Sequence, residues 1–427
     1  MKTATLGLGT IDRILTHAEI TSVCTDAMAG WHVDNKRVLV LIPDATRTCP
    51  LPLMFRLLYE RLAHRVRSLS FMVALGTHPA LTDEEMNRLV GVSAGELRAN
   101  YPKARLLNHR WKTPGELVTV GTLKASEVDR ITDGLFKMDV TVTCNKAVID
   151  NDLLLIVGPV FPHEVVGFSG GNKYIFPGIA GQGIIDFFHW LGAVITSPSV
   201  IGNKLTPVRA VVDHVAGMLS IERKAFCLVV KPGENSYGNG GEPGLAGLYF
   251  GTPEAAWSDA ADLSAKLHTR YMGRKFHTIL ASAPAMYDDL WTGGKCMYKT
   301  EPIAERGGRV IIHAPHITEI SRTHGDIIEK IGYHTRDFFL KQWERYKHYP
   351  WGVLAHSTHV KGLGTYENGI EKPHVEVILA TGINEKVCRQ VNLGYMDHRT
   401  IDIREFECRE NEGVLHVKKA GEILYRV

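Results

Sequence analysis

Short apolar runs alternate with segments of helical spacing along the first part of the chain. The runs that are typical of strands cover residues 38–42, 69–75, 140–143 and 153–157. Between them, residues 52–63 and 82–89 place apolar side chains at the spacing of a helix. The runs at 38–42 and 153–157 are apolar throughout, which is typical of strands covered on both faces. The pattern predicts an α/β fold with a mainly parallel sheet.

The same alternation resumes in the second half of the chain. Strand-like runs are expected at residues 276–281, 308–313, 353–357 and 374–379, with a final pair at 413–417 and 422–427. We place a domain change near residues 270–276, which predicts an N-terminal domain of residues 1–272 and a C-terminal domain of residues 273–399. By pattern alone, the final pair of strands could belong to either domain.

Composition and charge limit the classes of protein to which the chain can belong. A chain of 427 residues with 44% apolar side chains can bury two cores. Its net charge of +3, with both signs interspersed, gives no case for a nucleic-acid partner and suits a small anionic substrate. Seven scattered cysteines without a Cys-x-x-Cys pair indicate a reducing compartment. We find no charged leader and no run near the roughly 18 apolar residues of a membrane span, so we expect a cytoplasmic protein without a membrane partner.

The segment at residues 160–189 holds two histidines and a lysine in a glycine-rich turn, and two familiar motifs nearly match it. A P-loop needs a second glycine and a hydroxyl residue at the positions of Asn172 and Tyr174 in this chain. A zinc-protease helix needs a second histidine at the position of Gly167. Both motifs are therefore excluded, and hydrolysis of nucleoside triphosphates at a P-loop is excluded with them.

Lys173 lies in a turn that also contains Ser169, Gly170 and Gly171. Glycines let backbone N–H groups approach an anion closely, and an amine placed there can form a covalent bond. The alternative interpretation is a solvated lysine beside a tight turn. The other motifs of the chain distinguish between a reactive amine and a solvated lysine.

Polar motifs follow three of the predicted strands. They are Asp44 with Arg47, then His78, then His163. The carboxyl ends of parallel strands meet at one edge of a sheet, where α/β proteins bind their ligands. Each motif also has an ordinary explanation, such as a local Asp/Arg pair in a turn or one of the chain's 20 histidines at a structural position. His189 ends a helical segment and is also consistent with a histidine at the core edge.

Four separated motifs resemble those of the nickel-pincer lactate racemase family, in the same order over nearly the whole chain. They are residues 43–50 (PDATRTCP), 76–78 (GTH), 160–189 and 289–295 (DLWTGGK). Trp351 stands where that family has a tryptophan lining the substrate pocket. The resemblance implies two α/β domains with the active site in the cleft between them. It further implies that residues 1–272 bind the cofactor, that residues 400–427 return to that domain, and that residues 273–399 close the substrate site.

The resemblance also implies a cofactor, the nickel-pincer nucleotide (nickel pyridinium-3-thioamide-5-thiocarboxylic acid mononucleotide). Lys173 would hold it covalently through a thioamide, within the turn of Ser169, Gly170 and Gly171. His189 would be the protein ligand to nickel, a metal that imidazole suits. The cofactor comes from separate biosynthetic enzymes, which are therefore expected partners. A homo-oligomer is left open.

The remaining motif residues would act on the substrate, a 2-hydroxy acid. By resemblance, His78 and His163 are the acid/base pair, Arg47 and Lys295 hold the carboxylate, and Asp44 orients Arg47 or His78. Deprotonating the α-carbon would place a carbanion beside a carboxylate, whereas hydride removal avoids two adjacent negative charges. Hydride leaves to the pyridinium and returns on the other face, so one histidine is needed on each face. An ordinary histidine pKa of about 6.5 suits both roles.

The pocket residues depart from the family pattern and bear on the substrate. Trp291 and Thr292 stand where typical members have tyrosine and glutamine, and residues 293–294 are glycines that could open space. These features favour a substrate larger than lactate, such as an aldonate, with further polar candidates at Asn235, His356, His359 and Tyr366. An aliphatic or aromatic 2-hydroxy acid and a non-catalytic acid- or nucleotide-binding protein of the same fold remain alternatives. A dehydrogenase is disfavoured because the chain lacks a Gly-x-Gly-x-x-Gly turn between strand and helix.

Overall fold

The computed structural model describes residues 5–233 and 242–427, and these residues form two compact units. The N-terminal unit comprises Met1–Phe161, Phe168–Ile185 and Arg209–Leu267, and the C-terminal unit comprises Pro162–Gly167, Asp186–Val208 and His268–Val427. The division differs from a single boundary near residue 272, because two short segments group with the C-terminal unit. Those segments carry His163 and His189.

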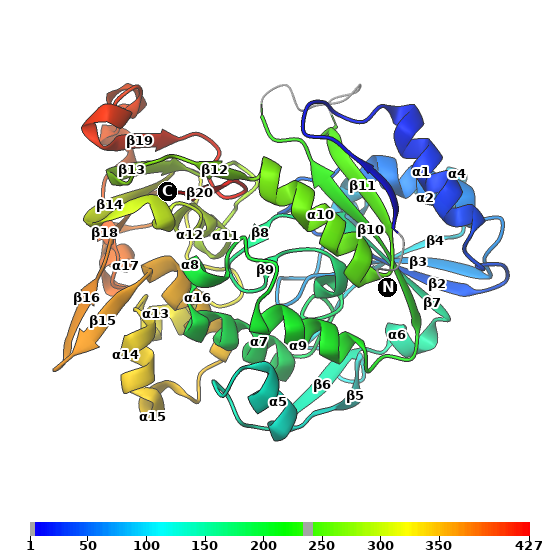
Figure 1. The fold of residues 1–427 in the computed structure, drawn as a ribbon, viewed down its shortest axis with the longest axis horizontal. Helices are drawn as coiled ribbons and strands as arrows, with labels where there is room; N and C mark the ends of the chain where they lie inside the picture. The colour runs from blue at the N-terminus through cyan, green and yellow to red at the C-terminus, as the bar shows by residue number, and fades with distance from the viewer. Residues whose placement is uncertain (1–4, 234–241) are drawn as a thin grey trace. The chain divides into compact units, whose positions relative to one another are not determined.

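A seven-stranded sheet forms the core of the N-terminal unit (Figure 1). Its strands, in spatial order, are β1 (Leu6–Gly9), β11 (Leu245–Gly251), β10 (Glu222–Val230), β7 (Leu153–Pro159), β2 (Arg37–Ile42), β3 (Ser68–Val73) and β4 (Ala104–Asn108). The strands from β10 to β4 are parallel, and β11 and β1 add an antiparallel edge. The expected α/β fold with a mainly parallel sheet is confirmed.

Both faces of this sheet are covered, which explains the continuous apolar runs. Val38, Val40 and Ile42 pack with residues of the helices α1 (His17–Ala29) and α2 (Leu51–Leu62). Leu39 and Leu41 alternate with them and are equally buried, so they point to the opposite face. Figure 1 shows the helix α10 (Pro253–Leu267) running across β10 and β11, on which it packs.

The chain order of the sheet locates a switch point between β2 and β7. From β2 the chain continues to β3 and β4 on one side, and it returns to β7 on the other side of β2. Connections after β2 and β7 therefore leave in different directions at the carboxyl edge of the sheet. Such a switch point is where open α/β sheets bind ligands.

The other elements up to residue 267 lie outside the seven-stranded sheet. The helices are α3 (Asp83–Leu89), α4 (Ala94–Asn100), α5 (Ala125–Ile131), α6 (Ala147–Asp150), η1 (Gly171–Tyr174), α7 (Gln182–Ile195), α8 (Ser197–Val200) and α9 (Pro207–Ala216). The predicted strand at residues 140–143 is β6 (Val140–Asn145), but it pairs antiparallel with β5 (Leu117–Leu123) outside the main sheet. Its alternating burial, with Val140 and Val142 inside and Thr141 exposed, accounts for a strand covered on one face only.

A five-stranded parallel sheet forms the core of the C-terminal unit. Its strands, in spatial order, are β18 (Gly394–Tyr395), β17 (Glu376–Thr381), β14 (Ala304–Ala314), β13 (Phe276–Ser282) and β19 (Val414–Val417). Two-stranded pairings join β15 (Gly364–Glu367) to β16 (Ile370–Pro373), β12 (Thr269–Tyr271) to β20 (Leu424–Arg426), and β8 (Pro162–His163) to β9 (Gly167–Phe168). The helices are α11 (Leu290–Gly293), α12 (Lys295–Tyr298), η2 (Glu301–Ile303), α13 (Gly325–Ile331), α14 (Arg336–Lys341), α15 (Trp343–Tyr346), α16 (Trp351–Lys361), α17 (Glu385–Gln390), η3 (His398–Thr400), η4 (Ile403–Phe406) and η5 (Glu410–Glu412).

Two expectations for this half of the chain are corrected. Residues 353–357 form part of the helix α16, not a strand, and all of residues 352–361 are buried. A short apolar run cannot distinguish a buried strand from a buried helix. Residues 400–427 do not return to the first sheet, because β19 pairs with β13 and β20 pairs with β12.

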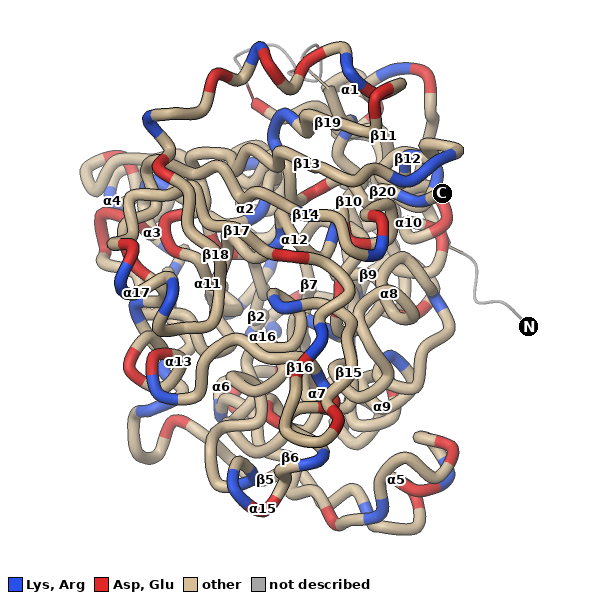
Figure 2. Tube along the Cα trace, turned by 90° about the vertical axis from the view of Figure 1, so that its left-hand side faces the viewer, with Lys and Arg blue, Asp and Glu red and all other residues tan. Residues whose placement is uncertain are grey.

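Positive and negative side chains are interspersed along the chain (Figure 2). Many charged groups are paired locally, as in Arg13 with Glu19 and Arg37 with Asp152. Among the described residues, we find no helix whose length and apolar character would let it span a bilayer.

Candidate functional site

Asp44 and His78 meet at the carboxyl edge of the N-terminal sheet. Asp44 follows β2, His78 follows the adjacent parallel strand β3, and Oδ2 of Asp44 lies 2.6 Å from Nδ1 of His78. The other carboxylate oxygen accepts hydrogen bonds from the Thr46 N–H (3.1 Å) and hydroxyl (2.7 Å). With Asp44 ionised, the His78 Nδ1–H donates to it, so Nε2 is the atom that can take up a proton. Of the two expected partners of Asp44, His78 is hydrogen-bonded to it and Arg47 interacts with it electrostatically.

The charge on Asp44 is stabilised by its neighbours. Burial acts to raise the pKa of this carboxyl group, but the charge and hydrogen bond of His78 and the charge of Arg47 outweigh it. The pKa of Asp44 therefore lies well below its ordinary value. The His78 side chain is 30% exposed and so retains access to solvent.

The turn that carries Lys173 is tied to the loop that carries His78. Lys173 is half-buried in η1, and its carbonyl accepts the N–H of Gly178 at 3.0 Å. The carbonyl of Gly178 in turn accepts the N–H of Gly76 at 2.8 Å. Tyr174, the next residue, interacts electrostatically with Arg47 and Asp44. The structure thus brings four predicted residues of the N-terminal unit into one region: Asp44, Arg47, His78 and Lys173.

Ser169 closes this turn through its hydroxyl group. The hydroxyl donates to the carbonyl of Pro159 (3.1 Å) and accepts the N–H of Phe161 (2.9 Å). Its carbonyl accepts the indole N–H of Trp257 at 2.9 Å. These contacts give Ser169 a role within the chain, and its expected contact with a cofactor stays a prediction.

Gly170 and Gly171 are required by the backbone. Their φ values are +86° and +58°, a region that favours glycine. A Cβ atom would lie 2.6 Å from Val160 Cγ2 at the first position and 2.9 Å from Trp257 Cβ at the second. The N–H of Gly171 is directed to the thiol of Cys227. Tight packing accounts for both glycines, and an anion contact through their N–H groups stays a prediction.

Arg209 also contacts the turn that contains Lys173, and no pattern in the sequence predicted this role. Its guanidinium donates to the carbonyl of Phe168 at 2.6 Å and lies 3.4 Å from that of Gly170. It also stacks 3.9 Å from the ring centroid of Trp257. Burial lowers the pKa of Arg209 to about 10, against the attraction of Asp213, so the side chain stays charged at neutral pH.

His163 is the buried candidate of the C-terminal unit, with an exposed fraction of 5%. Its Nδ1 lies 3.1 Å from the Val165 N–H and 3.3 Å from Oε2 of Glu164. These two contacts compete, since a neutral Nδ1 accepts the N–H and a protonated one pairs with the carboxylate. The ring therefore has a partner in either protonation state, which is the property of a group that both gives and takes protons.

His189 is half-buried on α7 and lies near the start of α16. The N–H of Gly352 donates to Asp186 of α7 at 2.8 Å, and a Cβ at position 352 would lie 4.0 Å from the His189 ring. Trp351 is the first residue of α16, and its indole N–H donates to the carbonyl of Lys347 at 2.9 Å. The structure places the predicted nickel ligand and the predicted pocket tryptophan in neighbouring elements of one unit.

Trp291 and Thr292 lie in α11 and are held by local contacts. Both the N–H (3.0 Å) and the hydroxyl (2.8 Å) of Thr292 donate to the Asp289 carboxylate, which caps the helix. The Trp291 ring lies 4.1 Å from the ring of His356 and 4.6 Å from that of His324, measured between centroids. Aspartate is a preferred residue at the start of a helix, and sequence reasoning could have recognised this signal at Asp289.

The two glycines after Thr292 do not open space. A Cβ atom at Gly293 would lie 2.8 Å from Ile317 Cδ1, and one at Gly294 would lie 2.7 Å from Val360 Cγ2. Lys295 follows at the start of α12, 8% exposed, with its ammonium 4.5 Å from the ring centroid of Tyr287. The glycines allow α11 and α12 to pack closely, so they give no support to a larger substrate.

The remaining polar candidates have mixed positions. His356 and His359 are buried on α16, three residues apart. Tyr366 lies on β15 and packs against Phe338. Asn235 lies outside the described residues.

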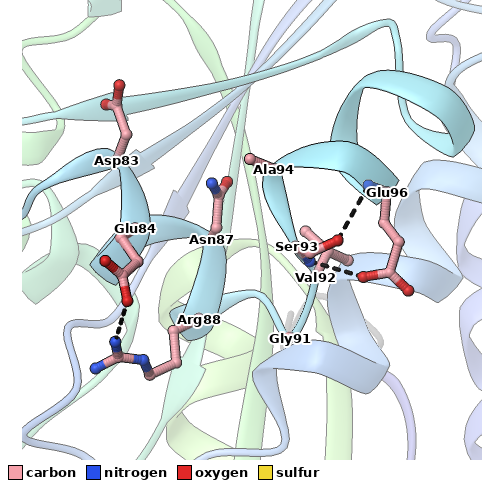
Figure 3. Close-up of a pocket in the computed structure, with 9 residues that line it drawn as sticks. All are labelled: Asp83, Glu84, Asn87, Arg88, Gly91, Val92, Ser93, Ala94 and Glu96. Atoms are coloured by element: carbon pink, nitrogen blue, oxygen red, sulfur yellow. Dashed lines mark hydrogen bonds and ion pairs between the residues drawn. The ribbon is translucent and has the colours of Figure 1, made fainter.

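A surface pocket of about 550 Å³ lies between α3 and α4 (Figure 3). Asp83, Glu84 and Glu96 line it, and the figure shows two of its contacts, Glu84 with Arg88 and Glu96 with Ser93. None of the candidate catalytic residues is among its lining residues. We therefore do not assign it to the site.

His189 is the predicted protein ligand to nickel, which it would bind through its imidazole. Within residues 5–233 and 242–427, no cluster of three or more His, Cys, Asp or Glu side chains could hold a metal ion. A nickel ion bound here by His189 needs its other ligands from a bound group, and the cofactor implied by the sequence motifs carries sulfur ligands of that kind.

Comparisons with known proteins match the N-terminal part of the chain to lactate racemases. Residues 10–201 match the model of the lactate racemase N-terminal domain. A curated lactate racemase of Thermoanaerobacterium thermosaccharolyticum is 27% identical over 148 residues, which are 34% of this chain and only 30% of that relative's length.

Two solved structures resemble the whole chain. A crystal structure of a protein from Thermotoga maritima is 30% identical with a TM-score of 0.88, over 98% of this chain and 99% of that one. The lactate racemase apoprotein of Thermoanaerobacterium thermosaccharolyticum is 18% identical with a TM-score of 0.68, over 95% of this chain and 93% of that one. At that identity, the second likeness concerns the fold alone.

Proposed function

The chain belongs to the lactate racemase family, and from this premise we propose that it is an isomerase that inverts C2 of a 2-hydroxy acid. The contact that carries the proposal is the 2.6 Å hydrogen bond between Asp44 and His78. A carboxylate held ionised beside Nδ1 fixes the histidine tautomer and stabilises the protonated ring. His78 is thereby prepared to take the proton of a substrate hydroxyl group.

His163 is proposed as the second acid/base group. Inversion through a planar 2-keto acid needs a proton acceptor for the hydroxyl on one face and a proton donor on the other. The two competing contacts of His163, with Val165 and Glu164, support this role because they stabilise both protonation states. Arg47 and Lys295 are the proposed partners of the substrate carboxylate.

The residues present suit the nickel-pincer nucleotide. Lys173 would hold it covalently, and His189 would bind its nickel. When bound, the cofactor supplies an electron-poor pyridinium that takes hydride from C2 and returns it. The protein positions the amine through the fixed turn at Ser169, Gly170 and Gly171, whose geometry leaves Lys173 half-buried.

A polyhydroxylated acid longer than lactate, such as an aldonate, is the proposed substrate class. Its support is the pair of imidazoles, His324 and His356, that lie against Trp291. Imidazole nitrogens can donate to or accept from the hydroxyl groups of such an acid. Burial keeps the pKa of His356 well below its ordinary value, so this ring is neutral and can accept. Inversion of an aldonate at C2 is an epimerisation.

The test is turnover of a panel of 2-hydroxy acids in deuterated water by protein co-expressed with the cofactor-making enzymes. Chiral chromatography follows the configuration at C2, and mass spectrometry follows deuterium there. Inversion without deuterium is expected, because hydride is returned internally. Inversion with deuterium would point to proton abstraction and reject the proposed mechanism. Inversion of short aliphatic acids alone would reject the aldonate.

A further inference from the structure

A small cavity lies beside the end of α7 in the C-terminal unit. Its volume is about 30 Å³, and its lining includes Ser197, Glu301, Arg336 and His359. These residues come from α8, η2, α14 and α16. A space of this size holds about one water molecule, provided that polar groups face it.

Three polar atoms at this cavity are buried without a hydrogen-bond partner in the part of the chain that the structure describes. They are the Ser197 hydroxyl oxygen, Glu301 Oε2 and His359 Nε2. Their residues are only 4%, 6% and 4% exposed. Leaving a buried polar atom unsatisfied is unfavourable, so three such residues at one cavity indicate that a hydrogen-bonding molecule belongs there. A buried water molecule commonly makes about three hydrogen bonds to groups of this kind.

Glu301 can hold a proton at this place. Its other oxygen, Oε1, accepts the N–H of Leu363 at 2.6 Å. Arg336 is committed elsewhere, since its guanidinium pairs with Asp337 at 2.9 Å and donates to the carbonyl of Val194 at 3.0 Å. Burial raises the pKa of Glu301 to about 7, against the effect of the Leu363 hydrogen bond, so the carboxyl group exchanges protons near neutrality.

His359 lines the cavity and lies within electrostatic range of Glu164, the neighbour of His163. It interacts electrostatically with Glu164 and with His189. Glu164 Oε2 lies 3.3 Å from Nδ1 of His163. Burial lowers the pKa of His359 to about 4, so its ring is neutral and can take a proton on one nitrogen as it releases one from the other. The groups His163, Glu164, His359 and Glu301 all belong to the C-terminal unit.

The proposed function requires the buried His163 to exchange a proton with solvent between turnovers. In each inversion one histidine takes the hydroxyl proton of the substrate, and the other gives a proton to the oxygen of the keto acid. After one turnover the first histidine has gained a proton and the second has lost one. A second turnover in the same direction requires both protons to be exchanged. His78, 30% exposed, exchanges with solvent directly, whereas His163, 5% exposed, needs a route.

We propose that Glu301, a water molecule in this cavity, His359 and Glu164 form the route by which His163 exchanges its proton between turnovers. The inference rests on the proposed function for its purpose, while the route itself is a property of the chain without substrate or cofactor. Glu301 is a positioning and proton-holding residue here, since it does not touch the substrate.

The first test uses the protein without cofactor, so that it does not depend on catalysis. Histidine ring nitrogens are labelled with ¹⁵N, the His163 signal is assigned with the His163→Gln variant, and the exchange rate of its ring N–H with solvent is measured by NMR. Glu301→Gln is expected to slow this exchange at least about tenfold. Glu305→Gln removes an exposed carboxylate and is the matched control, with exchange as in the parent protein. Equal exchange in all three proteins would reject the route.

A second variant and a second readout protect the test from a folding defect. Ser197→Ala removes one of the three atoms that would hold the water molecule and is expected to slow the exchange by a smaller factor. In cofactor-loaded enzyme, Glu301→Gln should lower steady-state turnover about tenfold, and a small diffusible buffer such as imidazole should restore part of it. A structural defect would not respond to buffer, so slow turnover without rescue counts against the route. If no protein racemises any acid, the exchange rate still decides the question.

Discussion

The two proposed acid/base histidines have opposite surroundings. His78 is partly open to solvent and supported by one ionised carboxylate, that of Asp44, at the edge of the N-terminal sheet. His163 is buried in the C-terminal unit and touches both a backbone N–H and the Glu164 carboxylate. The proposed acid/base task would thus fall to one histidine that is hydrogen-bonded to a single carboxylate and to another whose Nδ1 has two competing partners. Chemically equivalent roles do not require equivalent environments.

The two residues proposed to hold the cofactor also lie in different units. Their substitution is expected to have the largest effects. Lys173 belongs to the N-terminal unit and His189 to the C-terminal unit. Lys173→Ala should abolish the covalent adduct, because the amine is the proposed attachment point. His189→Ala should keep the organic adduct and lose the metal. Intact-mass spectra and elemental analysis for nickel measure the two losses separately. An adduct retained in the Lys173 variant would contradict the assignment.

Removal of either histidine should then abolish turnover in both directions. Each inversion uses both groups, so His78→Gln and His163→Gln should each lower the rate by at least about a thousandfold, even though their surroundings differ. Initial rates from each enantiomer, at several substrate concentrations, measure the effect. A variant that keeps one direction would break the proposed equivalence and remove that histidine from one half-reaction.

The carboxylate of Asp44 can be neutralised without changing its size. Asp44→Asn should lower turnover about a hundredfold, because the amide no longer stabilises a protonated His78. It should also change acid stability, since the pKa of Asp44 is depressed in the folded protein. Such a group stabilises the fold above its unfolded pKa of about 3.9, and this contribution is lost as pH falls toward the folded pKa. Denaturant titrations from about pH 5 down to about pH 2 should show a shallower loss of stability in the variant.

The contribution of Glu301 to stability should change with pH in the opposite direction to that of Asp44. Its pKa is raised to about 7 in the folded protein, so stability is full below the unfolded pKa of about 4.3 and falls as pH rises toward 7. The loss amounts to about 4 kcal/mol, at roughly 1.4 kcal/mol for each pH unit of the shift. Glu301→Gln should lack this slope in denaturant titrations between pH 4 and 8, and Glu305→Gln should keep it. A parallel slope in the Glu301 variant would show that the carboxyl group titrates normally.

The smallest expected effect concerns Thr292. Its hydroxyl donates to Asp289 at 2.8 Å, so Thr292→Val should destabilise the C-terminal unit by about 1 kcal/mol, measured by chemical denaturation. A substrate contact through the same hydroxyl would instead raise KM without a change in stability. The two results distinguish a helix cap from a binding group.

Much of the N-terminal sheet could be predicted from the sequence because a strand buried on both faces is apolar along its whole length. The runs at 38–42 and 153–157 are apolar throughout, and they form the adjacent strands β2 and β7. The run at 353–357 has the same appearance but forms part of the helix α16, since complete burial removes the polar face that would reveal a helix. Pairing partners are decided by the whole fold, which is why the placement of residues 400–427 was wrong.

The candidate site was predictable where residues follow strands and was not where contacts are distant in sequence. Asp44 and His78 could be expected at one sheet edge because their strands are adjacent and parallel. Arg209 supports the Lys173 turn from 36 positions further along the chain, and no local pattern announces it.

The hydrogen bond from the Gly76 N–H to the Gly178 carbonyl bears on protein engineering. It fastens the loop of His78 to the turn of Lys173, so a graft that replaces one of these segments also changes the backbone that supports the other. A chimaera built to alter the chemistry should therefore exchange the two segments as a pair. One built to alter substrate choice can begin with the α11 segment and α16, which do not share this bond.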